Sequence, residues 1–121
     1  MKTLIVSLKS SSEVMNDFKH ALTRARAGKI KKPHYEISFD NRKDFERFIR
    51  NISVLSTIIT LKPRSIYELA KLSKMDVSNM NKIILFFEEL GAVRLKEATL
   101  NGRTVKQPIV EYSKIEFDLA A

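Results

Sequence analysis

The chain has 121 residues, of which 44% are hydrophobic and 30% charged, and it contains no cysteine. This length suits one compact domain with an added arm, and the lack of cysteine excludes disulfides and thiolate metal sites. The net charge of +8 and the isoelectric point of about 9.8 favour a polyanionic partner. The first residues lack the apolar stretch of a signal peptide and no apolar run could span a membrane, so we expect a cytoplasmic protein.

Residues 1–39 are predicted to form a strand, a helix and a second strand. The β-branched, apolar segment 3–8 favours a short strand. Residues 11–27 carry apolar side chains at helical spacing, and residues 35–39 alternate apolar and polar side chains as a half-buried strand does. A basic stretch, residues 23–33, lies before the second strand. Its cations are Arg24, Arg26, Lys29, Lys31 and Lys32.

Two helices are predicted directly after this extension. Asp40 or Asn41 can cap the segment RKDFERFIRN, in which apolar residues form one stripe. The segment ISVLSTIITL is predicted as a second, apolar helix that ends at Pro63. Its many β-branched residues lower helix propensity, so a strand remains the alternative there.

A pair of helices follows Pro63. Ser65 is predicted to cap the first of them, and Glu68 lies three residues later, which makes a capping box. The second helix is predicted from about Val77 to Leu90, with Gly91 ending it. The side chains of the first helix that are expected to face inward are Ile66, Leu69, Ala70 and Leu72.

The end of the chain is predicted to form three strands. The dipeptide Asn101-Gly102 is the strongest hairpin signal in the chain, and it separates AVRLKEATL from RTVKQPIVEY. Pro108 indicates an edge strand or a break in pairing. The alternating segment 114–119 predicts a last strand.

This order of elements predicts an α+β fold. Residues 40–121 are expected to form a winged helix-turn-helix domain, and residues 1–39 a strand–helix–strand extension. In such a domain one helix enters the major groove of DNA and the hairpin touches the adjacent backbone or minor groove. The strands of the extension have no obvious local partner, although segment 114–119 is a candidate for one of them. We therefore expect the extension to build a homodimer or to contact a partner protein.

One face of the helix 77–90 is the predicted base-reading surface. Its N-terminal half is polar, and asparagine can pair with adenine while lysine reaches guanine or phosphate. The candidate base-reading residues are Ser78, Asn79, Asn81 and Lys82. In isolation an ordinary solvated face is the favoured explanation of these residues, because exposed serine, asparagine and lysine are common. The succession of helix, turn, helix and hairpin favours the DNA interpretation.

Phosphate contacts are expected from residues that flank this helix. The candidates are Arg64, Ser65, Lys74, Lys96, Arg103 and Lys106. Arg103 stands out because an arginine beside a hairpin tip can reach the minor groove. The basic stretch 23–33 is interpreted either as a further arm on DNA or as a contact for an acidic partner protein, with a solvated linker as the plain alternative.

The run SIYELAKLSKMDVSNMNKIILFFEELGAV resembles the helix-turn-helix of MarR-like transcriptional regulators, through ELA in its first helix and EELG at its end. Together with VMNDFKHAL, PHYEISFD, NGR and PIVEYSKIEFDL, it is similar to a small prokaryotic family of DNA-binding proteins that includes TumA-type antitoxins. The resemblance implies a homodimeric regulator that binds double-stranded DNA and, as an antitoxin, a cognate toxin. Members commonly carry more basic residues in the second helix than this chain does.

Catalysis is not indicated. His20 and His34 are the only histidines, no cluster has the spacing of metal ligands, and the three glycines form no phosphate-binding loop. We therefore expect no enzyme activity, no metal and no cofactor. The preferred function is a sequence-specific regulator that acts as an autoregulating antitoxin. The alternatives are a MarR-like repressor without a toxin partner and an architectural or RNA-binding module that acts through charge.

Overall fold

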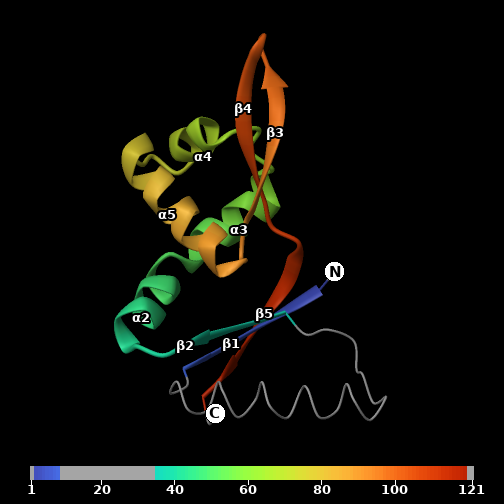
Figure 1. Ribbon diagram of the computed structural model, residues 1–121. Helices are drawn as coiled ribbons and strands as arrows, with labels where there is room; N and C mark the ends of the chain where they lie inside the picture. Colours follow the sequence, from blue (N-terminus) through green and yellow to red (C-terminus); the bar gives the residue numbers. More distant parts are fainter. Residues whose placement is uncertain (1, 9–34, 120–121) are drawn as a thin grey trace. The chain divides into compact units, whose positions relative to one another are not determined.

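The chain folds into an α+β structure, seen in a computed structural model that describes residues 2–8 and 35–119 (Figure 1). Two strands come first, then a series of helices, then three strands. The elements within the described residues are β1 (Lys2–Leu8), β2 (Tyr35–Phe39), α2 (Arg42–Arg50), α3 (Ile52–Leu61), α4 (Ile66–Leu72), α5 (Val77–Leu90), β3 (Arg94–Leu100), β4 (Arg103–Ile109) and β5 (Tyr112–Asp118). None of the described helices is long and apolar enough to cross a membrane.

The chain divides into two compact units. The first comprises residues 1–46 and 112–121, and the second comprises residues 47–111. This division differs from the predicted boundary after residue 39, because β5 pairs with β1 and returns the end of the chain to the first unit. The predicted helix 11–27 and the basic stretch 23–33 lie outside the described residues.

The first unit contains a three-stranded parallel sheet with the order β2-β1-β5. Val6 in the central strand is fully buried, and it lies opposite Ile37 of β2 and Phe117 of β5. Since successive residues of a strand point to opposite faces, these apolar side chains share one face of the sheet.

This pairing corrects one step of the sequence analysis. The strands of the extension do have partners within the chain, since β1 pairs with both β2 and β5. The predicted partnership of segment 114–119 with one of them is therefore confirmed. The inference of a homodimer from unpaired strands therefore loses its basis. The pairing was not foreseen because a parallel contact between distant segments leaves no signal in the neighbouring sequence.

Local signals mark the start of α2 and the end of α3. Asn41 caps α2, with its Oδ1 accepting the backbone N–H of Asp44 at 2.8 Å. Segment 52–61 forms the helix α3, so the strand alternative is wrong. This helix ends where Lys62 adopts a left-handed conformation with φ 47°, immediately before Pro63.

The second unit has its core between the helices. Met80, Ile84 and Phe87 of α5 are fully buried, and Phe48 meets Phe87 edge-on with the ring centroids 5.6 Å apart. Leu69 and Ala70 of α4 are buried as predicted. Leu72, also predicted to face inward, is 46% exposed. It is the last residue of α4, where the chain already turns towards α5.

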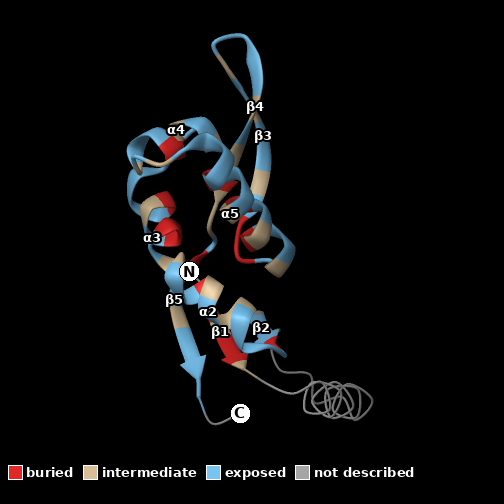
Figure 2. Ribbon diagram, turned by 90° about the vertical axis from the view of Figure 1, so that its left-hand side faces the viewer, coloured by how far each residue is buried: buried red, intermediate tan, exposed pale blue. Residues whose placement is uncertain are grey.

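An antiparallel hairpin completes the second unit. Its turn contains only Asn101 and Gly102, with φ angles of 52° and 76°, and positive φ at both positions is what a type I′ turn requires. Pro108 stays in register opposite Leu95, in a strand that is an edge of this two-stranded sheet. The edge-strand prediction is therefore confirmed, and the alternative of a break in pairing is wrong. Figure 2 shows the outer part of the hairpin exposed.

Candidate nucleic-acid interface

The exposed face of α5 carries all four residues that were predicted to contact bases. Ser78, Asn79, Asn81 and Lys82 are exposed, whereas the opposite side of the same helix supplies the buried core. The predicted polar face of this helix is therefore exposed in the structure. What the exposed face can offer chemically is two amides and one hydroxyl that both donate and accept hydrogen bonds, and one ammonium group.

A carboxylate lies at the beginning of this face. Asp76 is the N-cap of α5, and its Oδ2 accepts the backbone N–H of Asn79 at 3.2 Å. The cap satisfies a donor that has no partner inside the helix, and its negative charge suits the positive end of the helix dipole. Because Asp76 is exposed, the same charge would repel a phosphate that approached the start of α5.

The turn between α4 and α5 brings one cation beside that carboxylate. Lys74 adopts a left-handed conformation with φ 54°. Its N–H donates to the Lys71 carbonyl at 3.2 Å, and the Met75 N–H donates to the Ala70 carbonyl at 2.9 Å. This is the Schellman pattern, in which glycine is the usual residue at the position of Lys74. Within the described residues the Lys74 side chain has no ion-pair partner.

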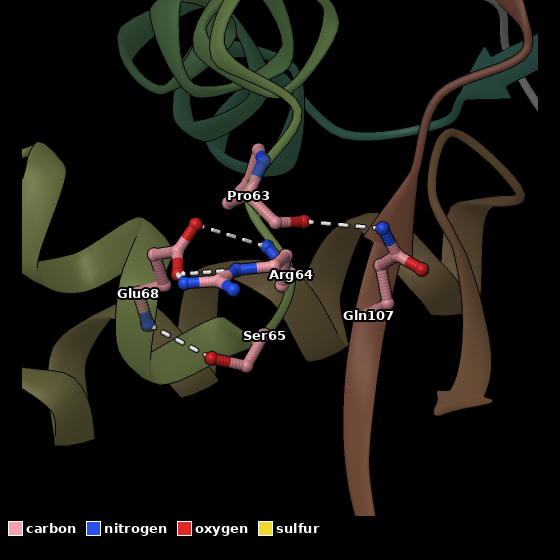
Figure 3. A network of polar contacts seen from close by, with 5 residues as sticks. All are labelled: Pro63, Arg64, Ser65, Glu68 and Gln107. Atoms are coloured by element: carbon pink, nitrogen blue, oxygen red, sulfur yellow. Dashed lines mark hydrogen bonds and ion pairs between the residues drawn. The ribbon is translucent and has the colours of Figure 1, made fainter. Parts of the chain in front are cut away.

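The start of α4 is closed by its own side chains (Figure 3). The Ser65 Oγ accepts the Glu68 N–H at 3.0 Å, which confirms the predicted cap. Glu68 accepts the backbone N–H of Arg64 at 3.3 Å rather than that of Ser65, so only one half of the predicted capping box forms. Glu68 also pairs with the Arg64 guanidinium at 3.0 Å. Ser65 is only 5% exposed, so its hydroxyl is committed to the helix rather than presented to a ligand.

The contacts with Arg64 change the pKa of Glu68. The side-chain hydrogen bond from Arg64 is the largest cause that lowers the pKa of Glu68, followed by the backbone N–H of Arg64. The carboxylate therefore stays ionised and neutralises Arg64. Of the predicted phosphate contacts, Arg64 is the one whose charge is already paired, although its side chain remains 67% exposed.

The pairing register of the hairpin shows on which of its two faces each predicted phosphate contact lies. Residues directly opposite one another in an antiparallel pair share a face. Lys96 lies opposite Gln107, and Arg103 lies on the same face as Gln107. The Gln107 side chain donates to the Pro63 carbonyl at 3.4 Å, so this face adjoins the segment before α4. Lys106 lies on the other face, opposite Glu97. The hairpin therefore places Lys96 and Arg103 on one face and Lys106 on the other.

The second unit is basic as a whole. It holds 11 Lys and Arg against 6 Asp and Glu, a difference of +5. Two of the cations are paired, Arg64 with Glu68 and Arg94 with Glu111 at 2.7 Å. The guanidinium of Arg47 lies over the Phe86 ring, 4.3 Å from its centroid. The predicted contacts Lys74, Lys82, Lys96 and Arg103 are exposed.

Two exposed residues of α4 that were not among the predicted contacts are chemically suited to phosphate. Tyr67 is 65% exposed and Lys71 is exposed one turn further along the same helix. A tyrosine hydroxyl and an ammonium group are both suited to phosphate oxygens. Their exposure could have been predicted from the sequence. Tyr67 and Lys71 are four residues apart and lie off the apolar stripe that contains Leu69 and Ala70.

The remaining predicted contacts are not placed. The five cations of the basic stretch 23–33 and both histidines lie outside the described residues. The described part of the chain contains no group of three or more His, Asp or Glu residues that could hold a metal ion.

Comparison with protein-family models matches residues 49–117 to the family described as HVO_A0114. The matched segment runs from the end of α2 into β5 and covers more than half of the chain. It includes both helices and the hairpin that carry the candidate interface. The comparisons with curated proteins and with solved structures gave no match. The chain therefore belongs to the HVO_A0114 family.

Proposed function

We propose that the protein is a winged helix-turn-helix regulator that binds double-stranded DNA in a sequence-specific manner. The observation that carries this proposal is the exposed polar set on the N-terminal half of α5. This helix follows α4 after a short turn, and β4 of the hairpin contacts α3 and α4 in the same unit. Helix-turn-helix proteins contact base edges with this end of their second helix.

Base contacts are assigned to α5. Asn79 and Asn81 offer the amide geometry that pairs with the N6 and N7 atoms of adenine, and Lys82 offers a donor to guanine or phosphate. The cap at Asp76 uses the backbone of Asn79 and leaves its side-chain amide for DNA. The acidic C-terminal half of α5, with Glu88 and Glu89, is assigned to the side away from the phosphates.

Phosphate contacts are assigned to cations that have no partner within the described residues. Lys74 precedes α5, and Lys96 with Arg103 occupies one face of the hairpin. Each neutralised phosphate releases counterions, so the binding constant should fall steeply as the salt concentration rises.

The proposal is tested by binding to the DNA upstream of the gene and to a shuffled duplex of the same composition, over a series of salt concentrations. Fluorescence anisotropy should give an affinity for the upstream DNA that is about 1,000-fold higher or more. Equal affinities for the two duplexes at every salt concentration would overturn sequence-specific recognition and favour the architectural or RNA-binding alternative.

The assignment of base contacts has its own test. Asn79→Ala and Asn81→Ala should each reduce discrimination between the two duplexes by about 1–3 kcal/mol while leaving binding to shuffled DNA unchanged. The matched control is Glu89→Asp, an exposed position on the same helix that should change neither affinity. Discrimination that is unaltered by both asparagine substitutions would contradict the assignment to α5.

The proposal extends to a homodimeric, cytoplasmic repressor that neutralises a cognate toxin. What supports the toxin is the resemblance to MarR-like, TumA-type antitoxins and the concentration of charge in residues 1–39, which hold 8 Lys and Arg against 3 Asp and Glu. Co-expression with the product of the adjacent gene provides the test. A stable complex and restored growth are expected, whereas neither would occur if the protein is a repressor without a toxin partner.

A further inference from the structure

The outer edge of β5 is the edge of a sheet, and this strand carries two exposed side chains of opposite charge. The strand order places β5 at one side of the parallel sheet, where it pairs with β1 alone among the described strands. An edge strand presents a row of backbone N–H and C=O groups to any strand that can align with it. The identity of that strand depends on what the side chains of β5 allow.

Two opposite charges flank the middle residue of β5. Lys114 and Glu116 are exposed and lie on either side of Ile115, which is the fourth of the seven residues of the strand. Neither charged side chain has a hydrogen bond or an ion pair within the described part of the chain. Since they are two residues apart, both point to the same face of the sheet.

We propose that the outer edge of β5 pairs with the same edge of a second copy of this chain. In an antiparallel pair centred on Ile115, the two-fold axis passes midway between Ile115 and the partner subunit's Ile115. Lys114 then lies opposite the partner subunit's Glu116, and Glu116 lies opposite the partner subunit's Lys114. Opposite charges in directly opposed positions stabilise an antiparallel pair. The two three-stranded sheets become one continuous sheet of six strands.

The charges select this register over its neighbours. Moving the centre to Glu116 places that carboxylate opposite its own copy, and moving it to Lys114 does the same with two ammonium groups. Directly opposed like charges are destabilising. Centring on Ile115 avoids both contacts, and it is also the register that pairs all seven residues of β5.

The apolar face of the sheet supports pairing at this edge. Phe117 remains 38% exposed although the Phe45 ring packs edge-on against it, with the centroids 6.3 Å apart. In the proposed pair Ile115 lies opposite the partner subunit's Ile115, and Phe117 lies opposite the partner subunit's Ser113. Leu119, which follows β5 and is 86% exposed, continues beyond the paired residues. Pairing would therefore cover apolar surface that the single chain leaves exposed.

The other edge of the sheet does not offer this complementarity. On β2 the single charge is Glu36, and its carboxylate already accepts the hydroxyls of Ser7 at 3.3 Å and Ser38 at 3.4 Å. Charged residues usually protect an edge strand from pairing. On β5, however, Lys114 and Glu116 carry opposite charges, so a second antiparallel copy of β5 places each charge opposite its complement. A strand without this charge pattern would not be matched in this way.

This inference rests on the homodimer within the proposed function, and it is tested without DNA so that the two can fail separately. Sedimentation velocity on the full chain, at concentrations up to about 100 µM, should show a dimer. Lys114→Glu leaves only carboxylates beside Ile115, and Glu116→Lys leaves only ammonium groups. Each variant alone should dimerise about tenfold more weakly or worse. An equimolar mixture of the two variants should recover association, because one edge is then acidic and the other basic.

Controls distinguish a lost interface from a lost fold. Lys96→Glu changes an exposed charge on the hairpin, and it should leave self-association unchanged. Circular dichroism should show the same helix content in all variants. A wild-type chain that stays monomeric overturns the proposal. So does a dimer that neither substitution weakens, or a mixture of the two variants that associates no better than each alone.

Discussion

The helices α4 and α5 begin in different ways, although both have a side-chain cap. At α4 the cap is the buried hydroxyl of Ser65, and Glu68 adds a carboxylate that holds Arg64. At α5 the cap is the exposed carboxylate of Asp76, and the nearby cation Lys74 has no ion-pair partner within the described residues. The charge of Arg64 at the start of α4 is therefore already neutralised, whereas the start of α5 leaves a cation available for the proposed contact with DNA.

At both helices a side-chain oxygen accepts one of the first backbone N–H groups, so neither helix start offers that donor to a phosphate. The two starts differ instead in the flanking cation, which is paired at α4 and has no ion-pair partner among the described residues at α5. The phosphate contact that was predicted from Arg64 depends on disrupting its pair with Glu68, and the one predicted from Lys74 does not. Substitutions at the two helix starts should thus have separable effects on stability and on DNA binding.

The largest effect is expected from removing the buried cap. Ser65→Ala leaves the Glu68 N–H without its acceptor in a site that water barely reaches, and it should lower the free energy of unfolding by about 1–2 kcal/mol. Asp76→Ala should cost less, because water can reach the exposed Asn79 N–H. Urea denaturation measures both, with Ser78→Ala as an exposed control that should change stability little. An equal loss at Ser65 and Asp76 would show that burial does not separate the two caps.

Lys74→Gly should affect stability and binding in opposite directions. Glycine adopts the left-handed conformation at this position without the steric cost that lysine bears, so the variant should be more stable by about 1 kcal/mol. The lost charge should reduce the slope of log K against log salt by about 1. A more stable variant that binds DNA less well cannot be explained by unfolding. Unchanged salt dependence would remove Lys74 from the interface.

The elements of the second unit could be predicted from sequence because their signals are local. The cap at Ser65, the apolar spacing of α5 and the Asn101-Gly102 turn each lie within a few neighbouring residues. The pair of Arg64 with Glu68 is equally local, at a spacing of four residues. It was not predicted because a capping box assigns the Glu68 carboxylate to the N–H of Ser65. The exposure of Leu72 was missed because periodicity does not say where packing ends at the last turn of a helix.

The first unit was harder to predict, for a physical reason. The pairing of β5 with β1 joins the two ends of the chain, and no neighbouring residue records such a contact. The parallel sheet therefore appeared in the sequence as isolated strands. The domain boundary was placed too simply, and a homodimer was inferred from strands that are in fact paired. The charge pattern of β5 provides an independent reason to expect self-association.

Asp76→Asn should remove the negative charge at the start of α5 without removing the cap. Asparagine caps a helix about as well as aspartate, so stability should change little. The loss of a negative charge at the start of α5 should raise the affinity for DNA by roughly two- to fivefold at low salt, and the gain should shrink as salt screens the charge. The comparison of upstream and shuffled duplexes should show the same gain for both. A gain confined to one sequence would mean that Asp76 contacts a base.

The smallest effect is expected from Glu68→Gln, because the pair that it breaks is exposed. The amide oxygen of glutamine can still accept the Arg64 backbone N–H, so the substitution removes mainly the charge. Arg64 then becomes free to bind a phosphate, and the salt dependence of DNA binding should become slightly steeper.

The pH dependence of that variant checks the cause of the effect. Arg64 lowers the pKa of Glu68 in the folded chain, so the unfolded chain takes up the proton at a higher pH than the folded one. The contribution of the pair is fully present above the usual pKa of a glutamate, and it is lost as the pH falls through the lowered value. The stability difference between wild type and Glu68→Gln should therefore be measurable near neutral pH and should shrink as the pH falls below the usual pKa of a glutamate. A difference that persists in acid would indicate that the shape of the side chain, rather than its charge, closes the start of α4.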